Sequence, residues 1–103
     1  MSIKKKYSKN KKNCKVTFTV PKEIGDQFKT ISLVGDFNLW DPKENIFLKT
    51  EKDGVYSASI ILVSNNHYQF RYLGDGAHWF NEPDADKEVE TYFPGARNSV
   101  VVV

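Results

Sequence analysis

Strict alternation of apolar and polar residues is the feature that most constrains how this chain can fold. It begins near Val16 and, from there onward, no segment sustains the spacing of an amphipathic helix. In the first run Val16, Phe18 and Val20 alternate with polar residues, and Pro21 ends the run. Because successive side chains of a strand point to opposite faces, this period is typical of half-buried strands. The sequence therefore predicts an all-β fold.

Turn signals divide the alternating region into short segments. Asp53-Gly54 is a strong hairpin signal, and Gly74-Asp75-Gly76 marks another turn. Short strands at such close spacing predict an immunoglobulin-like β-sandwich of about seven or eight antiparallel strands. The expected strands cover residues 15–20, 30–34, 46–49, 55–63, 67–73, 78–80, 89–93 and 98–103.

The alternation also predicts which side chains face the core. Within 55–63 one face carries only apolar or aromatic residues, and the same holds within 67–73. The residues expected to face the core are Tyr56, Ala58, Ile60, Leu62, Tyr68, Phe70 and Tyr72. The opposite face of 67–73 carries His67, Gln69 and Arg71, which we expect to point outward.

Basic residues are concentrated at the N-terminus. The first 15 positions hold seven of the 15 basic residues, and the remaining 88 hold eight basic and 13 acidic side chains. Lysines separated by Ser and Asn do not supply apolar surface to bury, so we expect 1–15 to be a disordered basic tail that aids solubility. Nucleic acid is an unlikely partner on this interpretation, and the folded domain is expected to span 16–103.

Neither membrane insertion nor catalysis is indicated by the residue pattern. The single cysteine, Cys14, cannot form an internal disulfide, and no apolar run reaches the ~18 residues of a membrane helix. We expect a cytoplasmic protein. No Cys–His, metal-ligand or phosphate-loop pattern occurs, so neither an enzyme nor a cofactor or metal is expected. The acidic run Asp84, Asp86, Glu88 and Glu90 is interpreted as a solvated face.

Two tryptophans lie where strand alternation does not explain them. Trp40 falls in a polar loop before Asp41-Pro42, and Trp79 follows the glycine-rich turn at 74–76. A flat indole can cover the axial C–H face of a glucose ring while polar side chains bond its hydroxyl rim. The alternative is that one indole caps the end of the core, and spacing alone leaves this open.

The residues around these tryptophans resemble carbohydrate-binding module family 48. The resemblance begins with the motif Ile-Ser-Leu-Val-Gly-Asp-Phe-Asn-Leu-Trp at 31–40 and extends over nearly all of 16–103. That family includes the isoamylase early-set domains and the glycogen-binding domain of the AMP-activated protein kinase β subunit. The further matching residues are Asp53-Gly54-Val55-Tyr56, Tyr68-Gln69-Phe70-Arg71-Tyr72, Asp75-Gly76, Trp79, Gly95, Asn98 and Ser99.

The resemblance implies glycogen or starch binding through an α-1,4-linked glucan site. Trp40 and Trp79 correspond to the family's two sugar-stacking tryptophans. Arg71 stands where kinase-type domains have a lysine that bonds the glucan, and Asn98 matches an asparagine that contacts sugar hydroxyls. On residue type alone, Asn98 can instead bond backbone, and Arg71 can pair with an acid such as Asp75.

The sequence departs from the family pattern at two places. One extra residue precedes Trp79, and in a strand a single insertion reverses the faces, so His78 competes for the second stacking position. Pro94 and Ala96 replace a leucine and a threonine that flank the sugar in kinase-type domains. Tyr92 and Phe93 are candidates to compensate for them.

Three functional hypotheses follow. The first is a non-catalytic module that binds an α-glucan polysaccharide or malto-oligosaccharide and recruits a separate glucan-processing enzyme. The second is a protein-interaction or regulatory sandwich that has lost sugar binding and pairs with a partner or second copy through an edge strand, for which 100–103 is the candidate. The third, a glucan-processing enzyme, has no support in the residues, since fold analogy does not transfer function.

Overall fold

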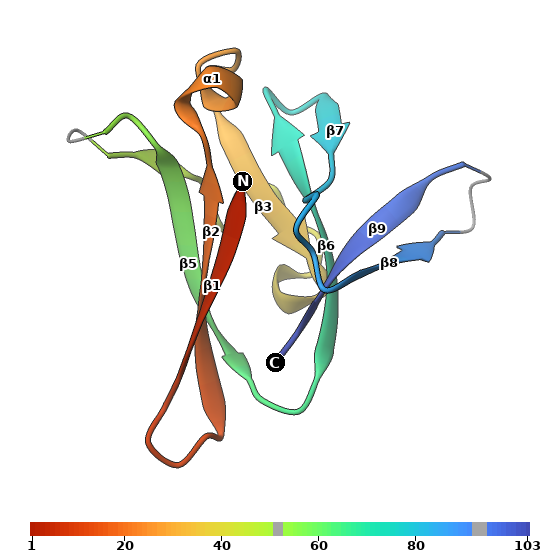
Figure 1. Ribbon diagram of the computed structural model, residues 1–103. Helices are drawn as coiled ribbons and strands as arrows, with labels where there is room; N and C mark the ends of the chain where they lie inside the picture. The colour runs from red at the N-terminus through yellow and green to blue at the C-terminus, as the bar shows by residue number, and fades with distance from the viewer. Residues whose placement is uncertain (51–52, 92–94) are drawn as a thin grey trace.

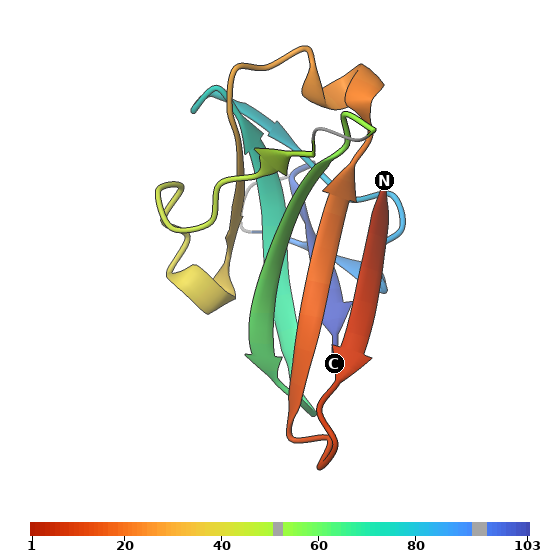
Figure 2. The ribbon, with the colours of Figure 1, turned by 90° about the vertical axis from the view of Figure 1, so that its left-hand side faces the viewer.

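The computed structural model describes residues 1–50, 53–91 and 95–103. These residues form nine β-strands, one helical turn, α1 (Lys22–Gly25), and one 3-10 turn, η1 (Asp36–Asn38). The strands lie in two antiparallel sheets that face each other across the core (Figures 1 and 2). The prediction of an all-β sandwich is confirmed. Within these ranges no helix is long and apolar enough to cross a membrane.

The first sheet, here called sheet A, has four strands and the second, sheet B, has five. Sheet A is ordered β1 (Ser2–Tyr7), β2 (Asn13–Val20), β5 (Tyr56–Val63) and β4 (Leu48–Lys49). Sheet B is ordered β3 (Ile31–Gly35), β6 (His67–Gly74), β9 (Arg97–Val102) and β8 (Lys87–Glu90), and β7 (His78–Phe80) also pairs with β6. β6 is therefore the strand on which most of sheet B is assembled.

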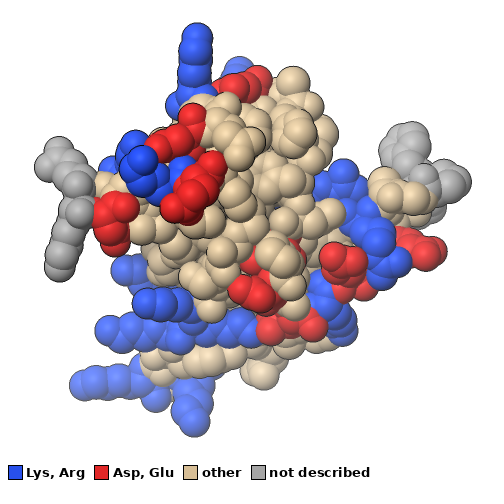
Figure 3. All heavy atoms as spheres, turned by 45° about the horizontal axis from the view of Figure 1, so that its top comes forward, with Lys and Arg blue, Asp and Glu red and all other residues tan. Residues whose placement is uncertain are grey.

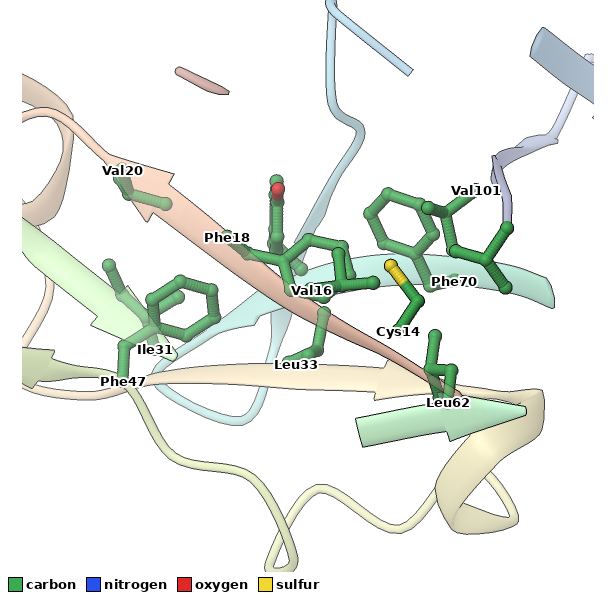
Figure 4. Close-up of a cluster of buried hydrophobic side chains, with 12 residues drawn as sticks. Cys14, Val16, Phe18, Val20, Ile31, Leu33, Phe47, Leu62, Phe70 and Val101 are labelled. Carbon is green, nitrogen blue, oxygen red and sulfur yellow. The ribbon is translucent and has the colours of Figure 1, made fainter. Parts of the chain in front are cut away.

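Aromatic residues from both sheets form the centre of the core. Phe18 of sheet A and Phe70 and Tyr72 of sheet B are fully buried, and the ring centroids of Phe18 and Phe70 lie 5.0 Å apart at an edge-on angle (Figure 4). Burying each such side chain contributes roughly 1.5–3 kcal/mol. The core faces predicted for 55–63 and 67–73 are confirmed, because Leu62 is buried and the other expected residues pack against the same cluster.

Residues 1–15 do not form the predicted disordered tail. β1 pairs with β2 over its whole length, from Ser2 opposite Thr19 to Tyr7 opposite Cys14. The outer face of this sheet lies in water, so β1 can carry exposed lysines just as β2 carries the exposed Lys15. Ile3 packs against the core beside Phe18, which anchors the strand.

The predicted domain boundary at 16 is also wrong. Cys14 is fully buried and belongs to the core cluster (Figure 4). The Lys5 ammonium lies 2.7 Å from a carboxylate oxygen of Asp86, which ties β1 to the segment before β8. The hairpin of β1 and β2 is therefore part of the sandwich.

The valine run at the C-terminus, where we expected a free edge, begins between two neighbouring strands. β9 lies between β6 and β8, and Val100 is paired with Gln69 on one side and Lys87 on the other. Val101 and Val102 pair only with β6, and the Val102 N–H donates to the Asp86 carboxylate at 2.7 Å, so edge pairing is excluded at Val100 and remains a prediction for the end of the run. The strand expected at 89–93 is observed as β8, which begins at Lys87 and ends at Glu90, while 92 and 93 lie outside the described residues.

Candidate functional site

The outward face of β6 carries a chain of polar side chains. Arg71 and Gln69 point away from the core because Phe70 and Tyr72, which alternate with them, are buried. The Nε atom of Arg71 donates to Oδ1 of Asn98 at 2.6 Å, and Nδ2 of Asn98 donates to Oε1 of Gln69 at 3.0 Å. Asn98, on β9, therefore bridges two β6 side chains and holds the guanidinium group in place.

The acid that was considered as an alternative partner of Arg71 is engaged elsewhere. Oδ1 of Asp75 accepts hydrogen bonds from the backbone N–H groups of Lys29 at 2.8 Å and Thr30 at 3.1 Å. These bonds tie the turn after β6 to the segment before β3. Arg71 is thus positioned by Asn98, in agreement with the outward orientation predicted from alternation.

Trp40 is presented by a loop with an unusual backbone. Leu39 and Trp40 both have left-handed conformations, with φ of 56° and 58°, which costs a bulky residue on the order of 1–2 kcal/mol. The N–H of Trp40 donates to the carbonyl of Gly35 at 2.9 Å, and its indole Nε1 donates to Oδ1 of Asp36 at 3.0 Å. The strained conformation is therefore held at both the backbone and the ring.

Two polar side chains of η1 anchor this loop to the sheet. Oδ2 of Asp36 accepts the backbone N–H of Gln69 at 2.8 Å, so one carboxylate joins the indole of Trp40 to β6. Asn38 accepts the N–H of Gly35 at 3.1 Å and donates to the Leu33 carbonyl at 2.8 Å. Loop and sheet thus form one support for the indole.

Trp79 comes from the short strand β7. It pairs with Leu73 of β6, so it lies on the same outward face as Arg71, and 46% of its surface is exposed. His78 faces the other way, with its ring centroid 5.4 Å from that of Phe28. Of the two residues that competed for the second aromatic position, the structure brings Trp79, and not His78, toward Trp40.

These side chains line one hollow on the outside of sheet B. It has a volume of about 280 Å³, and its lining residues are Trp40, Arg71, Trp79, Thr91 and Asn98. Four of the five residues predicted for a carbohydrate site therefore meet here. Neither indole is enclosed in the core cluster, which removes the alternative in which one of them caps the core.

A second hollow, of about 470 Å³, adjoins the first and is more polar. The two share Trp40, Thr91 and Asn98, and the second adds Asp36, Gln69 and Glu90. Aromatic and hydrogen-bonding surfaces thus lie next to each other on one face. An extended, hydroxyl-rich ligand with apolar patches is complementary to such a surface.

A scan against protein-family models and a search of curated proteins found no match to this chain. The resemblance described above therefore depends on the motif residues alone.

The acidic run at 84–90 is divided among separate contacts. Glu88 and Glu90 lie 2.9 and 3.5 Å from nitrogens of Arg97, while Asp86 pairs with Lys5. Burial raises the pKa of Asp86, but the bonds from Lys5 and from the Val102 N–H outweigh it and hold the pKa below its usual range. In the part of the chain that the structure describes, no three His, Cys, Asp or Glu residues are grouped to hold a metal.

Sequence reasoning did not single out Thr91, whereas Asp36 was expected to stabilise the loop that presents Trp40. The side-chain and backbone groups of Thr91 donate to the Ala96 carbonyl, each at 3.1 Å, which closes the loop between β8 and β9. Alternation places Gln69 on the same face of β6 as Arg71, so the sequence could have indicated Gln69 as a site residue. Contacts between separate loops, such as those of Thr91, produce no periodic pattern in a sequence. The candidates at 92, 93 and 94 lie outside the described residues.

Proposed function

We propose that this chain is a non-catalytic module that binds α-1,4-linked glucans such as glycogen, starch or malto-oligosaccharides. The observation that carries the proposal is the single hollow in which Trp40 and Trp79 lie beside Arg71 and Asn98. The motif at 31–40 supports the same class of ligand through its resemblance to carbohydrate-binding module family 48.

Two aromatic platforms account for a modest affinity. Removing the apolar face of a sugar and one indole from water contributes on the order of 1–3 kcal/mol. Two such contacts, with a few hydrogen bonds, offset the entropy lost on binding and give dissociation constants of roughly micromolar to millimolar. Trp40 is held in place before the ligand arrives by Asp36 and Gly35, so little ordering is needed on binding.

Polar groups at the rim supply orientation. The guanidinium of Arg71 carries four N–H donors besides the Nε–H that Asn98 accepts. The carboxylate of Glu90 in the adjoining hollow is an acceptor for sugar hydroxyls. Donors and acceptors on both sides of the platforms are complementary to hydroxyl groups, each of which both donates and accepts.

The proposed role is recruitment and not chemistry. Glycoside hydrolysis needs two carboxyl groups across a cleft with one in an apolar, pKa-raising environment. In the hollows described here Asp36 and Glu90 are both exposed, and Asp36 is occupied in holding Trp40. On this proposal the module acts in the cytoplasm and brings a separate glucan-processing enzyme to its substrate.

Calorimetric titration with maltoheptaose tests the proposal. We expect saturable binding by the wild-type chain, none with a cello-oligosaccharide of equal length, and about 10- to 100-fold weaker maltoheptaose binding by Trp40→Ala. Tyr7→Ala is the matched control, because Tyr7 is an exposed aromatic on the other sheet, 45% accessible. Equal binding by wild type and Trp40→Ala, or no binding at millimolar ligand, would contradict the proposal and favour an interaction domain that has lost sugar binding.

A further inference from the structure

The hairpin of β1 and β2, residues 2–20 and here called the basic hairpin, concentrates positive charge on an ordered surface. It holds seven lysines, and the first acidic residue of the chain is Glu23. Because β1 is paired with β2 throughout, these lysines have defined positions that a disordered tail would not give them. In Figure 3 lysine side chains project together from the lower side of the molecule, where β1 and β2 lie.

The strand register sorts the lysines by face. Lys4 lies opposite Thr17 and Lys6 opposite Lys15, on the side of sheet A that points away from the core. Lys5 points to the other side, where it pairs with Asp86. The remaining lysines of the hairpin, Lys9, Lys11 and Lys12, occupy its turn. Apart from Lys5, none of the seven forms an ion pair with another described residue.

Exposed aliphatic residues lie directly beside these lysines. Ile61 of β5 is opposite Lys15, and Val63 is opposite Asn13; they are 70% and 60% exposed. An open hollow of about 370 Å³ joins the two kinds of residue, with Tyr7 at its side. The outer face of sheet A at this end is therefore both cationic and apolar.

We propose that this face binds the surface of an anionic lipid bilayer. Lysines near such a surface attract it additively, and four to eight clustered basic residues suffice for recruitment. The exposed Ile61 and Val63 can enter the boundary between headgroups and acyl chains, where an apolar side chain gains from leaving water. Charge and apolar exposure on one flat sheet face together match this partner.

Other anionic partners fit the same surface less well. A nucleic acid would use the lysines but would gain nothing from exposed aliphatic side chains, and stacking on bases needs aromatic residues, of which this face offers Tyr7. An acidic protein is disfavoured because lysine is depleted in the centres of protein interfaces. The bilayer is the partner that uses both the lysines and the aliphatic residues.

The proposed membrane face does not depend on the proposed glucan site. The basic hairpin and β5 present it on the outside of sheet A, which faces sheet B across the sandwich (Figure 2). Trp40 and Trp79 line the hollow outside sheet B. The two ligands can therefore be held at the same time. Trp40→Ala should leave vesicle binding unchanged, so failure of one proposal is distinguishable from failure of the other.

Vesicle sedimentation tests the proposal with the whole chain. We expect binding to vesicles of phosphatidylcholine with 30% phosphatidylserine, no binding to phosphatidylcholine alone, and a decline with added salt. Each lysine contributes about fivefold in affinity, so Lys6→Glu/Lys15→Glu should weaken binding by at least about 25-fold. The matched control is Lys29→Glu/Lys43→Glu, which changes the net charge by the same amount at exposed positions away from the hairpin. This control should bind the vesicles at least fivefold more tightly than the hairpin variant Lys6→Glu/Lys15→Glu.

A second pair of variants separates a bilayer from other polyanions. Ile61→Ser/Val63→Ser should weaken vesicle binding several-fold. Leu48→Ser should not, because Leu48 is 73% exposed but lies on β4 opposite Ser57, at the other end of β5 from Ile61 and Val63. Unchanged melting temperatures would show that all variants fold. The proposal is overturned if wild type ignores anionic vesicles at low salt, or if the hairpin variant matches its control. It is equally overturned if the Ile61/Val63 variant binds like wild type while duplex DNA competes fully, since the surface would then be a nucleic-acid site.

Discussion

Replacing Asp36 with alanine should weaken glucan binding without touching the ligand's stacking surface. One carboxylate oxygen accepts the indole N–H of Trp40 at 3.0 Å, and the other accepts the backbone N–H of Gln69 at 2.8 Å. Hydrogen bonds to a charged group contribute about 1.5–3 kcal/mol each, and the lower end applies because Asp36 is exposed. Without the bond to the indole, about 1.5 kcal/mol of support for the presented conformation is lost.

That loss has to be compared with the strain it offsets. Leu39 and Trp40 are both left-handed, at a cost on the order of 1–2 kcal/mol each, so the loop in Asp36→Ala has competing conformations of similar free energy. When only a fraction of molecules presents the indole, the apparent dissociation constant rises by the inverse of that fraction. Conformations of equal free energy would give about a twofold weaker affinity for maltoheptaose, and the full 1.5 kcal/mol about a tenfold weaker one, so we expect calorimetry to show a value within this range.

Asp41→Ala is the matched control for this variant. Asp41 lies in the same loop and accepts the Lys43 N–H at 2.9 Å, whereas the Trp40 indole donates to Asp36. Nuclear magnetic resonance of the two indole N–H groups, assigned with Trp79→Phe, should show faster solvent exchange of Trp40 in Asp36→Ala alone. If Asp36→Ala and Asp41→Ala bind and exchange alike, the reasoning about indole positioning is refuted.

Three further predictions concern the sandwich itself. Tyr72→Phe removes the hydroxyl that donates to the carboxylate of Glu82 at 2.7 Å, and Glu82 is only 1% exposed. Urea denaturation should therefore show a free energy of unfolding lower by about 2 kcal/mol, and an unchanged free energy would contradict a stabilising role for this bond. Asp86 has a folded pKa below its unfolded value, so its contribution to stability is complete above about pH 4 and declines as pH falls through the folded pKa. The melting temperature should fall less on acidification in Asp86→Asn than in the wild-type chain. An equal fall in both would refute the contribution assigned to Asp86. The buried Cys14 thiol should react with a thiol reagent only on unfolding, so rapid reaction of the native chain would contradict its burial.

Period-two patterning was sufficient to predict the strands from β2 onward and the orientation of β6. Phe70 and Tyr72 face the core and Arg71 faces outward, as alternation requires, because strand geometry couples sequence position directly to side. The position of Trp79 on the same outward face was less certain from the sequence. It depends on how the turn at 74–76 absorbs one extra residue, which a sequence pattern does not specify.

The basic hairpin was mispredicted because its stability is not carried by its lysines. Composition treats a lysine-rich segment as unable to fold, yet β1 needs only backbone pairing with β2, the contact of Ile3 with the core and the Lys5–Asp86 ion pair. Those contacts are supplied by the rest of the chain. Similarly, residue type does not indicate that Trp40 adopts a left-handed backbone, since the Asp36 carboxylate that bonds its indole is itself held by the N–H of Gln69 on β6.

The central claim is that both tryptophans form one glucan platform, and the two indole N–H resonances test it most directly. On titration with maltoheptaose we predict that both resonances shift with the same dissociation constant, and that neither shifts with a cello-oligosaccharide of equal length. The shared hollow of Trp40, Arg71, Trp79 and Asn98 requires this joint response. A shift of one indole alone, equal shifts with the β-linked sugar, or no shift at millimolar maltoheptaose would contradict the account.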